Sequence, residues 1–281
     1  MAMQDSLFAG QDGEIDTPQP DRQPRRLRVM ITVTAAPNPS SGSGETVCVA
    51  GLEVGVAVTS WVRLYPVNLR HLVSDGRFRK YDIVEVDARP ATSDSRLESW
   101  KPDMSSLRVV SRQKSSWSRR AWIDPVVSTS MCALQAAVES DAKAPSLALL
   151  RPVTIRDIEL APHPGWTADE QRKIDAYVNQ YDLLDATEKV PLEAPRFKGW
   201  YLYKCGEPTC RGHRQGVLDW EFVAYQRRLQ NLSDERTVQK LRERFLGMVC
   251  DPRKDTCFYV GNQAKRRQTF SVIGMYYPPR S

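Results

Sequence analysis

Two thiols and an imidazole lie within nine residues of this sequence, at Cys205, Cys210 and His213. Glycine and proline residues between them bend the chain, so that the three side chains can converge. Zn²⁺ prefers thiolate and neutral imidazole ligands, and a turn of this kind brings them to tetrahedral separation. The segment therefore predicts a small zinc site. The alternative is a turn in which two thiols merely lie near each other.

A structural zinc site needs a fourth protein ligand, because only a catalytic site keeps one position for water. Cys250 is the first candidate, since it ends a predicted helix where the chain must turn, and Cys257 is the second. Cys48 and Cys132 are expected to be small buried core residues. The predicted ligands of one structural Zn²⁺ ion are Cys205, Cys210, His213 and Cys250.

Two carboxylates, Asp219 and Glu221, open a predicted helix shortly after this segment. Hard carboxylate ligands can hold Mg²⁺ for phosphodiester hydrolysis, which would make the chain a metal-dependent nuclease. Residues two apart on a helix point to different sides, however, and no lysine obviously completes the set. Capping of the helix amino terminus explains both acids more simply.

The stretch from residue 100 to residue 122 interleaves aromatic and basic side chains. Guanidinium groups neutralise phosphates, and exposed indoles stack on unpaired bases. The alternative is that the tryptophans belong to the core and the arginines are solvated or pack on aromatic rings. The candidate nucleic-acid-binding residues of this stretch are Trp100, Arg108, Arg112, Lys114, Trp117, Arg119 and Arg120.

A second basic cluster, Lys265, Arg266 and Arg267, forms the tip between two predicted strands. It is a further candidate for phosphate contacts, and its alternative reading is a solvated hairpin tip.

Charge and composition narrow the class of protein. The 281 residues include 40 Lys and Arg against 34 Asp and Glu, and a net charge of +6 suits a polyanionic partner such as DNA or RNA. The sequence contains no run of about 18 apolar residues, which a membrane-spanning helix would need, and the first 24 residues lack the pattern of a secretory signal. Six cysteines are too few for a disulfide scaffold in this length. We expect a cytoplasmic protein.

Short strands dominate the first half of the chain. Residues 1–24 are rich in Gly and Pro and are expected to be a disordered tail. No helix long enough for a crossover separates the strands that follow, so residues 25–190 are predicted to form an OB-like β-barrel with helical additions. The strands are expected at Leu27–Thr34, Thr46–Gly51, Val56–Pro66 and Tyr81–Ala88.

Residues 191–281 are predicted to form a zinc-stabilised α+β unit. Apolar residues recur at helical spacing from Leu218 to Leu229 and again from Val238 to Val249, and two strands close the chain. In the preceding part, Thr167 and Glu170 form a capping box that starts another helix. The fold class is therefore α+β.

Two short elements carry a resemblance to a known group of proteins. Cys48, Ala50 and Gly51 match a Cys-x-Ala-Gly element, and Trp61, Val62 and Arg63 match the beginning of a Trp-Ile-Arg-Pro-like element, although Leu64 and Tyr65 precede Pro66 here. This combination resembles bacterial dual OB-like domain proteins over roughly residues 27–112. The resemblance implies a nucleic-acid module of antiviral defence or mobile-element systems. The Cys/His segment also looks like the ending of uncharacterised bacterial proteins with this layout.

Together these observations predict a non-enzymatic nucleic-acid-binding protein, the recognition component of a larger bacterial system with further protein subunits. A metal-dependent nuclease is the first alternative. A protein–protein adaptor subunit is the second.

Overall fold

A computed structural model describes residues 23–39, 46–68, 78–92, 94–141, 143–179, 190–264 and 266–280 of the chain. Most of the predicted tail at residues 1–24, and Lys265 of the predicted basic tip, lie outside these residues. No helix of the described part is long and apolar enough to cross a membrane.

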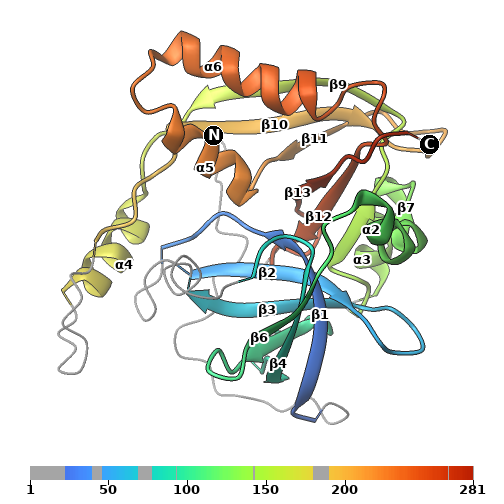
Figure 1. The fold of residues 1–281 in the computed structure, drawn as a ribbon. Coiled ribbons are helices and arrows are strands. Elements are labelled where there is room, and N and C mark those ends of the chain that lie inside the picture. The colour runs from blue at the N-terminus through green and yellow to red at the C-terminus, as the bar shows by residue number, and fades with distance from the viewer. Residues whose placement is uncertain are drawn as a thin grey trace.

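The first part of the chain forms a closed barrel of five strands (Figure 1). These strands are β1 (Arg25–Thr34), β2 (Thr46–Glu53), β3 (Trp61–Asn68), β4 (Asp82–Pro90) and β5 (Ser99–Pro102). They follow the order β1-β2-β3-β5-β4, and β4 pairs back onto β1. The β3–β5 pair is parallel, and the other pairs are antiparallel. The prediction of an α+β chain with an amino-terminal barrel is confirmed.

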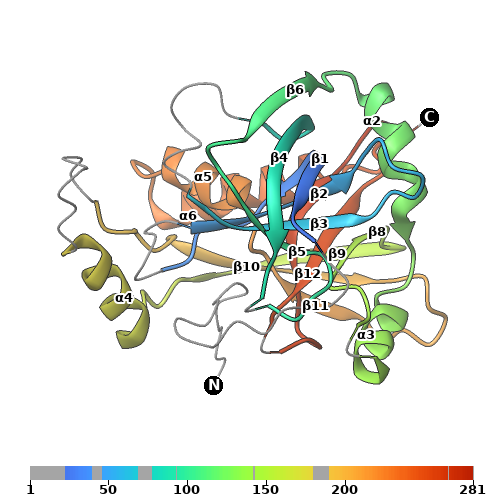
Figure 2. The ribbon, with the colours of Figure 1, turned by 90° about the horizontal axis from the view of Figure 1, so that it is seen from below.

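A sixth strand, β6 (Arg108–Arg112), continues along β4 where β5 ends. Among the described residues β6 pairs only with β4, so it is an edge strand. Figure 2 shows that β6 leads directly into helix α2 (Ser116–Ile123) on the outside of the barrel.

The rest of the chain, the C-terminal unit, contains two further sheets with helices around them. One sheet has the order β11-β10-β9, and the other has the order β13-β12-β8-β7. Their strands are β7 (Val127–Ser128), β8 (Leu147–Leu150), β9 (Thr154–Pro162), β10 (Phe197–Lys204), β11 (His213–Gly216), β12 (Cys257–Asn262) and β13 (Phe270–Tyr276). The helices are α3 (Met131–Ser140), α4 (Ala168–Val178), α5 (Trp220–Arg228) and α6 (Asp234–Arg242), and a π-helical turn, Glu243–Met248, continues α6.

The predicted domain boundary at residue 190 does not coincide with the way the strands pair into sheets. Strands β8 and β9 precede that residue, yet β8 pairs with β12 and β9 pairs with β10. Both therefore belong to the C-terminal unit. The β8–β12 pair joins segments about 100 residues apart in the sequence, and the β9–β10 pair joins segments about 40 residues apart. Local sequence patterns cannot predict pairing over such separations.

The outer wall of the barrel packs against the sheet that contains β8, β12 and β13. Side chains from one face of β1 and β2 point away from the barrel interior and join a buried cluster with Leu149, Tyr259 and Ile273. The opposite face of the same strands fills the barrel with a separate core. Both faces of β2 are consequently buried, and its eight residues are all inaccessible to solvent.

Two buried arginines complete this interface. Arg63 on β3 is fully buried and donates to Ser146 Oγ at 2.8 Å, just before β8. Arg96, in the β4–β5 loop, donates to the carbonyl of Asn262 at 2.7 Å. Burial disfavours the charged form of Asp94, but its hydrogen bond with Arg96 and the charge of that residue lower its pKa to about 2. Buried charges are tolerated only with such partners, so these contacts fix how the two parts meet.

Gly51, the last residue of the Cys-x-Ala-Gly element, has a specific packing role in the barrel. It faces Ile31 across the β1–β2 pair. A Cβ atom at this position would lie 2.3 Å from the carbonyl oxygen of Met30 and 2.6 Å from Cγ1 of Val29. Only glycine allows β1 and β2 to approach this closely.

Replacing Gly51 with alanine should therefore destabilise the protein by about 1–3 kcal/mol, because the added methyl group overpacks a rigid barrel. Chemical denaturation would measure this change. Gly247→Ala is the matched control, since a Cβ there would meet only the Arg242 carbonyl at 3.9 Å. Equal midpoints for the two variants would contradict the packing role of Gly51.

Candidate metal centre

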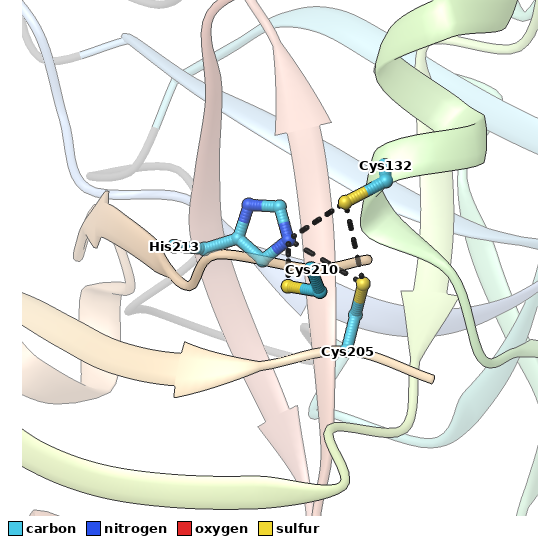
Figure 3. Close-up of side chains that lie close together, drawn as sticks. All are labelled: Cys132, Cys205, Cys210 and His213. Carbon is cyan, nitrogen blue, oxygen red and sulfur yellow. Dashed lines mark hydrogen bonds between the residues drawn. The ribbon is translucent and has the colours of Figure 1, made fainter. Parts of the chain in front are cut away.

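Three of the predicted ligands meet in space, and a fourth residue joins them from another part of the chain. Cys205 follows β10, Cys210 lies in the turn, and His213 begins β11, whereas Cys132 comes from the first turn of α3. The ligand atoms of all four lie within 4.8 Å of one another. Figure 3 shows the imidazole ring and the three sulfur atoms pointing toward a common centre.

The distances suit a tetrahedral site. His213 Nε2 lies 3.3 Å from Cys210 Sγ, 3.4 Å from Cys205 Sγ and 3.5 Å from Cys132 Sγ. Cys205 Sγ and Cys132 Sγ are 3.7 Å apart. With metal–sulfur bonds of about 2.3 Å, a tetrahedron has sulfur–sulfur edges of about 3.8 Å. The four residues can therefore hold a metal ion with little rearrangement.

Local backbone features bring the two contributing segments together. Gly212 has φ +109°, which lets the chain turn back so that His213 pairs with Tyr203 across the β10–β11 hairpin. The amide of Gly206 donates to the carbonyl of Thr129 at 2.6 Å, and a Cβ on Gly206 would lie 3.0 Å from that oxygen. Ser130 then caps α3 and sets the direction of its first turn.

The thiols of the cluster differ in acidity. Burial disfavours the Cys205 thiolate, but hydrogen bonds from the backbone of Cys132 and Glu207 and from His213 outweigh it and lower the pKa of Cys205 to about 6. Burial and the neighbouring Cys205 raise the pKa of Cys132 to about 12. A bound metal ion would deprotonate the ligating thiols outright, so metal binding would release protons.

The predicted fourth ligand, Cys250, lies elsewhere and is corrected to Cys132. Cys250 Sγ donates to the carbonyl of Phe245 at 3.3 Å, within the turn after α6. Cys257, the second candidate, is fully buried in β12. Cys132 was expected to be a buried core residue, and it is a half-buried residue that packs against the core of the C-terminal unit, with its thiol in the cluster.

Metal content distinguishes these two cysteines. Purified wild-type protein should contain about one equivalent of metal, and Cys132→Ser should lose most of it, because three ligands hold an ion much more weakly than four. Cys250→Ser, the matched control, should keep the wild-type content. Elemental analysis without chelators gives the answer, and normal metal in Cys132→Ser would contradict the geometry.

The two acids considered for a nuclease site form a different arrangement. Asp219 caps α5 and accepts the Glu221 amide at 2.8 Å, as the capping interpretation predicted. Lys80, which the sequence pattern did not indicate, lies with its Nζ 3.4 Å from a Glu221 oxygen and donates to the Met275 carbonyl at 2.8 Å. Lys80 thus connects the segment before β4 with α5, through Glu221, and with β13, through Met275.

Asp219 is almost fully buried, and one of its carboxylate oxygens has no hydrogen-bond partner. Burial, and then the charge of Glu221, raise its pKa to about 7. The unfolded chain therefore loses this proton near pH 4, whereas the folded chain keeps it until about pH 7. The contribution of Asp219 to the free energy of unfolding therefore falls as the pH rises from about 4 to about 7, and it is constant above pH 7.

Asp219→Asn should remove this penalty while keeping the capping oxygen. Between pH 5 and pH 8 the variant should gain on the order of 2 kcal/mol of stability relative to wild type. Denaturation midpoints of both proteins at the two pH values test this. Parallel changes in the two proteins would show that Asp219 is ionised throughout.

The aromatic residues of the 100–122 stretch have different environments. Trp100 is buried in the barrel core, with the guanidinium carbon of Arg25 5.0 Å from its ring centroid. Trp117, on α2, is 78% exposed. Of these two indoles, only Trp117 offers a face to an external ring.

Arg119 and Arg120 hold α2 against the rest of the protein. Arg119 donates to the carbonyls of Gln113 and Lys114, both at 2.7 Å, and stacks 4.2 Å from the ring of Tyr81. Arg120 donates to the Pro279 carbonyl. This geometry agrees with the alternative interpretation of the sequence, in which these arginines pack within the fold.

The remaining basic candidates lie on two surfaces. Arg108, Arg112 and Lys114 are exposed on one face of β6 and its extension. Arg108 contacts Glu85 at 2.5 Å and Arg112 contacts Asp82 at 3.8 Å. At the tip between β12 and β13, Arg266 is exposed, whereas Arg267 donates to the Ala144 carbonyl at 2.8 Å.

Two family models match the chain, and both are described as domains of unknown function. The first, DUF8758, matches residues 25–125, which comprise the barrel, β6 and α2. The second, DUF8757, matches residues 127–281, which contain all four residues of the Cys/His cluster. No curated protein matches the chain. Because the second model covers more than half of the 281 residues, the chain belongs to the DUF8757 family of proteins of unknown function.

Proposed function

We propose that this chain is a non-enzymatic nucleic-acid-binding protein, the recognition component of a bacterial defence or mobile-element system. The observation that carries the proposal is the exposed face of β6 with the start of α2, which we call the β6–α2 stripe. It consists of the exposed residues Arg108, Arg112 and Lys114, followed by the exposed Trp117. Alternate residues of a strand lie about 6.7 Å apart on one face, so Arg108 and Arg112 are about 13 Å apart with the exposed Val110 between them, and Lys114 continues the row. Cations in such a row can contact successive phosphates of a nucleic-acid backbone.

The strand order of the barrel, with its parallel β3–β5 pair, supports an OB-like type. OB-folds bind oligonucleotides on the face of their second and third strands and with the adjacent loops. Here that face packs against the C-terminal unit, and Arg96 of the β4–β5 loop bonds to Asn262. A binding surface on this barrel must therefore lie elsewhere, and the β6–α2 stripe is on its uncovered side.

Charge distribution supports the same surface. Residues 25–125 contain 16 Lys and Arg against 10 Asp and Glu, a basic balance concentrated in the barrel and α2. Two of the stripe's cations already contact carboxylates. Both guanidinium groups are nevertheless open to solvent, with side-chain exposures of 61% and 47%, so a phosphate can contact them beside these carboxylates. The alternative reading is an edge strand whose charges prevent aggregation.

We further propose that the Cys132, Cys205, Cys210 and His213 cluster binds one Zn²⁺ ion with a structural role. Three thiolates and one imidazole are a ligand set that zinc accepts, and four protein ligands leave no position for a reacting water. The turn between Cys205 and His213 has few large apolar residues, so metal binding would supply the free energy that orders it.

A nuclease remains the runner-up, because Lys80 joins Asp219 and Glu221 in space. Asp219, however, is almost fully buried and caps a helix, which leaves Glu221 as the accessible acid. The protein–protein adaptor is the third candidate.

Binding to single-stranded and duplex oligonucleotides over a salt series, with Mg²⁺ present and products separated on a gel, separates these functions. We expect binding that weakens steeply with salt and no cleavage. The double variant Arg112→Ala/Lys114→Ala should lower the salt slope by about one for each lost phosphate contact, and Trp117→Ala should weaken single-strand binding about ten-fold.

Arg236→Ala/Lys240→Ala, which removes two exposed charges from α6, is the matched control and should leave the slope nearly unchanged. Cleavage that requires Mg²⁺ would favour the nuclease. Absence of binding at low salt would reject both nucleic-acid functions and leave the adaptor.

A further inference from the structure

A small aromatic pocket lies where the β1–β2 loop meets the C-terminal unit, remote in sequence from the β6–α2 stripe. It has a volume of about 70 Å³ and is lined by Ala36–Asn38, by His163 and Trp166 before α4, and by Phe197 and Phe222. Domain contacts are common places for ligand sites. Neither the metal centre nor the stripe contains any of these residues.

The walls of the pocket are held in place before any ligand binds. Trp166 Nε1 donates to the carbonyl of Leu192 at 2.8 Å, and the Trp166 ring packs edge-to-face with His163 at 5.5 Å between centroids. Gln226, itself buried, accepts the amide of Phe197 at 2.8 Å and donates to its carbonyl at 3.2 Å. The aromatic surfaces are thus preorganised, which lowers the entropy cost of binding.

Polar groups at the same pocket have unused hydrogen-bonding capacity. Within the described residues, the side chains of Asn38 and Lys198, which line it, make no hydrogen bond or ion pair. His163 Nδ1 accepts the Gly165 amide at 3.0 Å, so a neutral imidazole carries its proton on Nε2. Burial, with help from Lys198, lowers the pKa of His163 and keeps the ring neutral. The pocket therefore offers an amide and two donors beside flat apolar walls, and Glu193 adds a carboxylate to its lining.

We infer that this pocket binds one unstacked nucleobase of a single strand, with the ring against Trp166 and its polar edge toward Asn38 and Lys198. The inference rests on the proposed nucleic-acid binding and names the chemical group that is read. A nucleobase is a planar ring with carbonyl acceptors at its edge, which matches both features of the pocket. The volume of about 70 Å³ is smaller than a cavity that encloses one benzene ring, so the pocket would take one edge of a base, and a two-ring base would leave more of its surface outside.

Free nucleosides test the pocket without the backbone. We expect thymidine and deoxycytidine to bind the full chain in the millimolar range, at least five-fold tighter than deoxyadenosine, with no binding of deoxyribose 5-phosphate. Trp166→Ala should abolish nucleoside binding, and the α6 control Arg236→Ala/Lys240→Ala should leave it unchanged. Since Trp166→Ala also removes a hydrogen bond to Leu192, Asn38→Ala serves as a second variant that keeps the aromatic walls and should weaken binding about five-fold.

Oligonucleotides separate this inference from the function on which it rests. If oligothymidine binds with a steep salt dependence while no nucleoside binds, the pocket inference fails and the proposed function stands. If nucleosides bind through Trp166 but no oligonucleotide binds, the stripe fails and the pocket stands. Equal nucleoside affinity in wild type, Trp166→Ala and Asn38→Ala would overturn the pocket.

Discussion

The packing of the barrel's outer wall against the sheet of β8, β12 and β13 is the contact on which the rest of the structure depends. Apolar side chains from β1 and β2 fill it, and the buried Arg63 and Arg96 complete it with hydrogen bonds to Ser146 and Asn262. An apolar interface alone would tolerate sliding, whereas buried guanidinium groups must keep their partners. The relative placement of the two parts is therefore specified, and with it the pocket between the β1–β2 loop and α5.

The same contact determines which strands of the barrel remain exposed to solvent. The second strand of the barrel is buried on both faces, whereas β6 and the first residues of β1 have exposed side chains. An edge strand that carried apolar side chains there would invite pairing with other chains. Arg108 and Arg112 flank the exposed Val110 on β6, and charges at these positions disfavour such pairing. The Cys/His cluster, in contrast, lies within the C-terminal unit, where it brings α3 and the β10–β11 hairpin together.

Features that depend on neighbouring residues could be read from the sequence. The pattern of apolar residues predicted strands β1 to β4, although it missed β5, and the capping box of Thr167 and Glu170 forms as predicted. Cys205, Cys210 and His213 converge because they share one hairpin. Cys132 could not be found in this way, since it lies 73 residues before Cys205 and reaches it through tertiary contacts that include the Gly206–Thr129 hydrogen bond. Side-chain burial was equally hard to predict, because Trp100 and Trp117 have similar neighbours but opposite environments.

The order of the strands along the chain has a consequence for synthesis on the ribosome. The barrel and β6 are complete at residue 112, but the strands that cover its outer wall, β12 and β13, end only at residue 276. At about 5–20 residues per second, the apolar wall formed by β1 and β2 stays uncovered for roughly ten to thirty seconds. During this interval the side chains of β1 and β2 that later pack against Tyr259 and Ile273 are exposed on the nascent barrel, and such an apolar surface is prone to association with other chains.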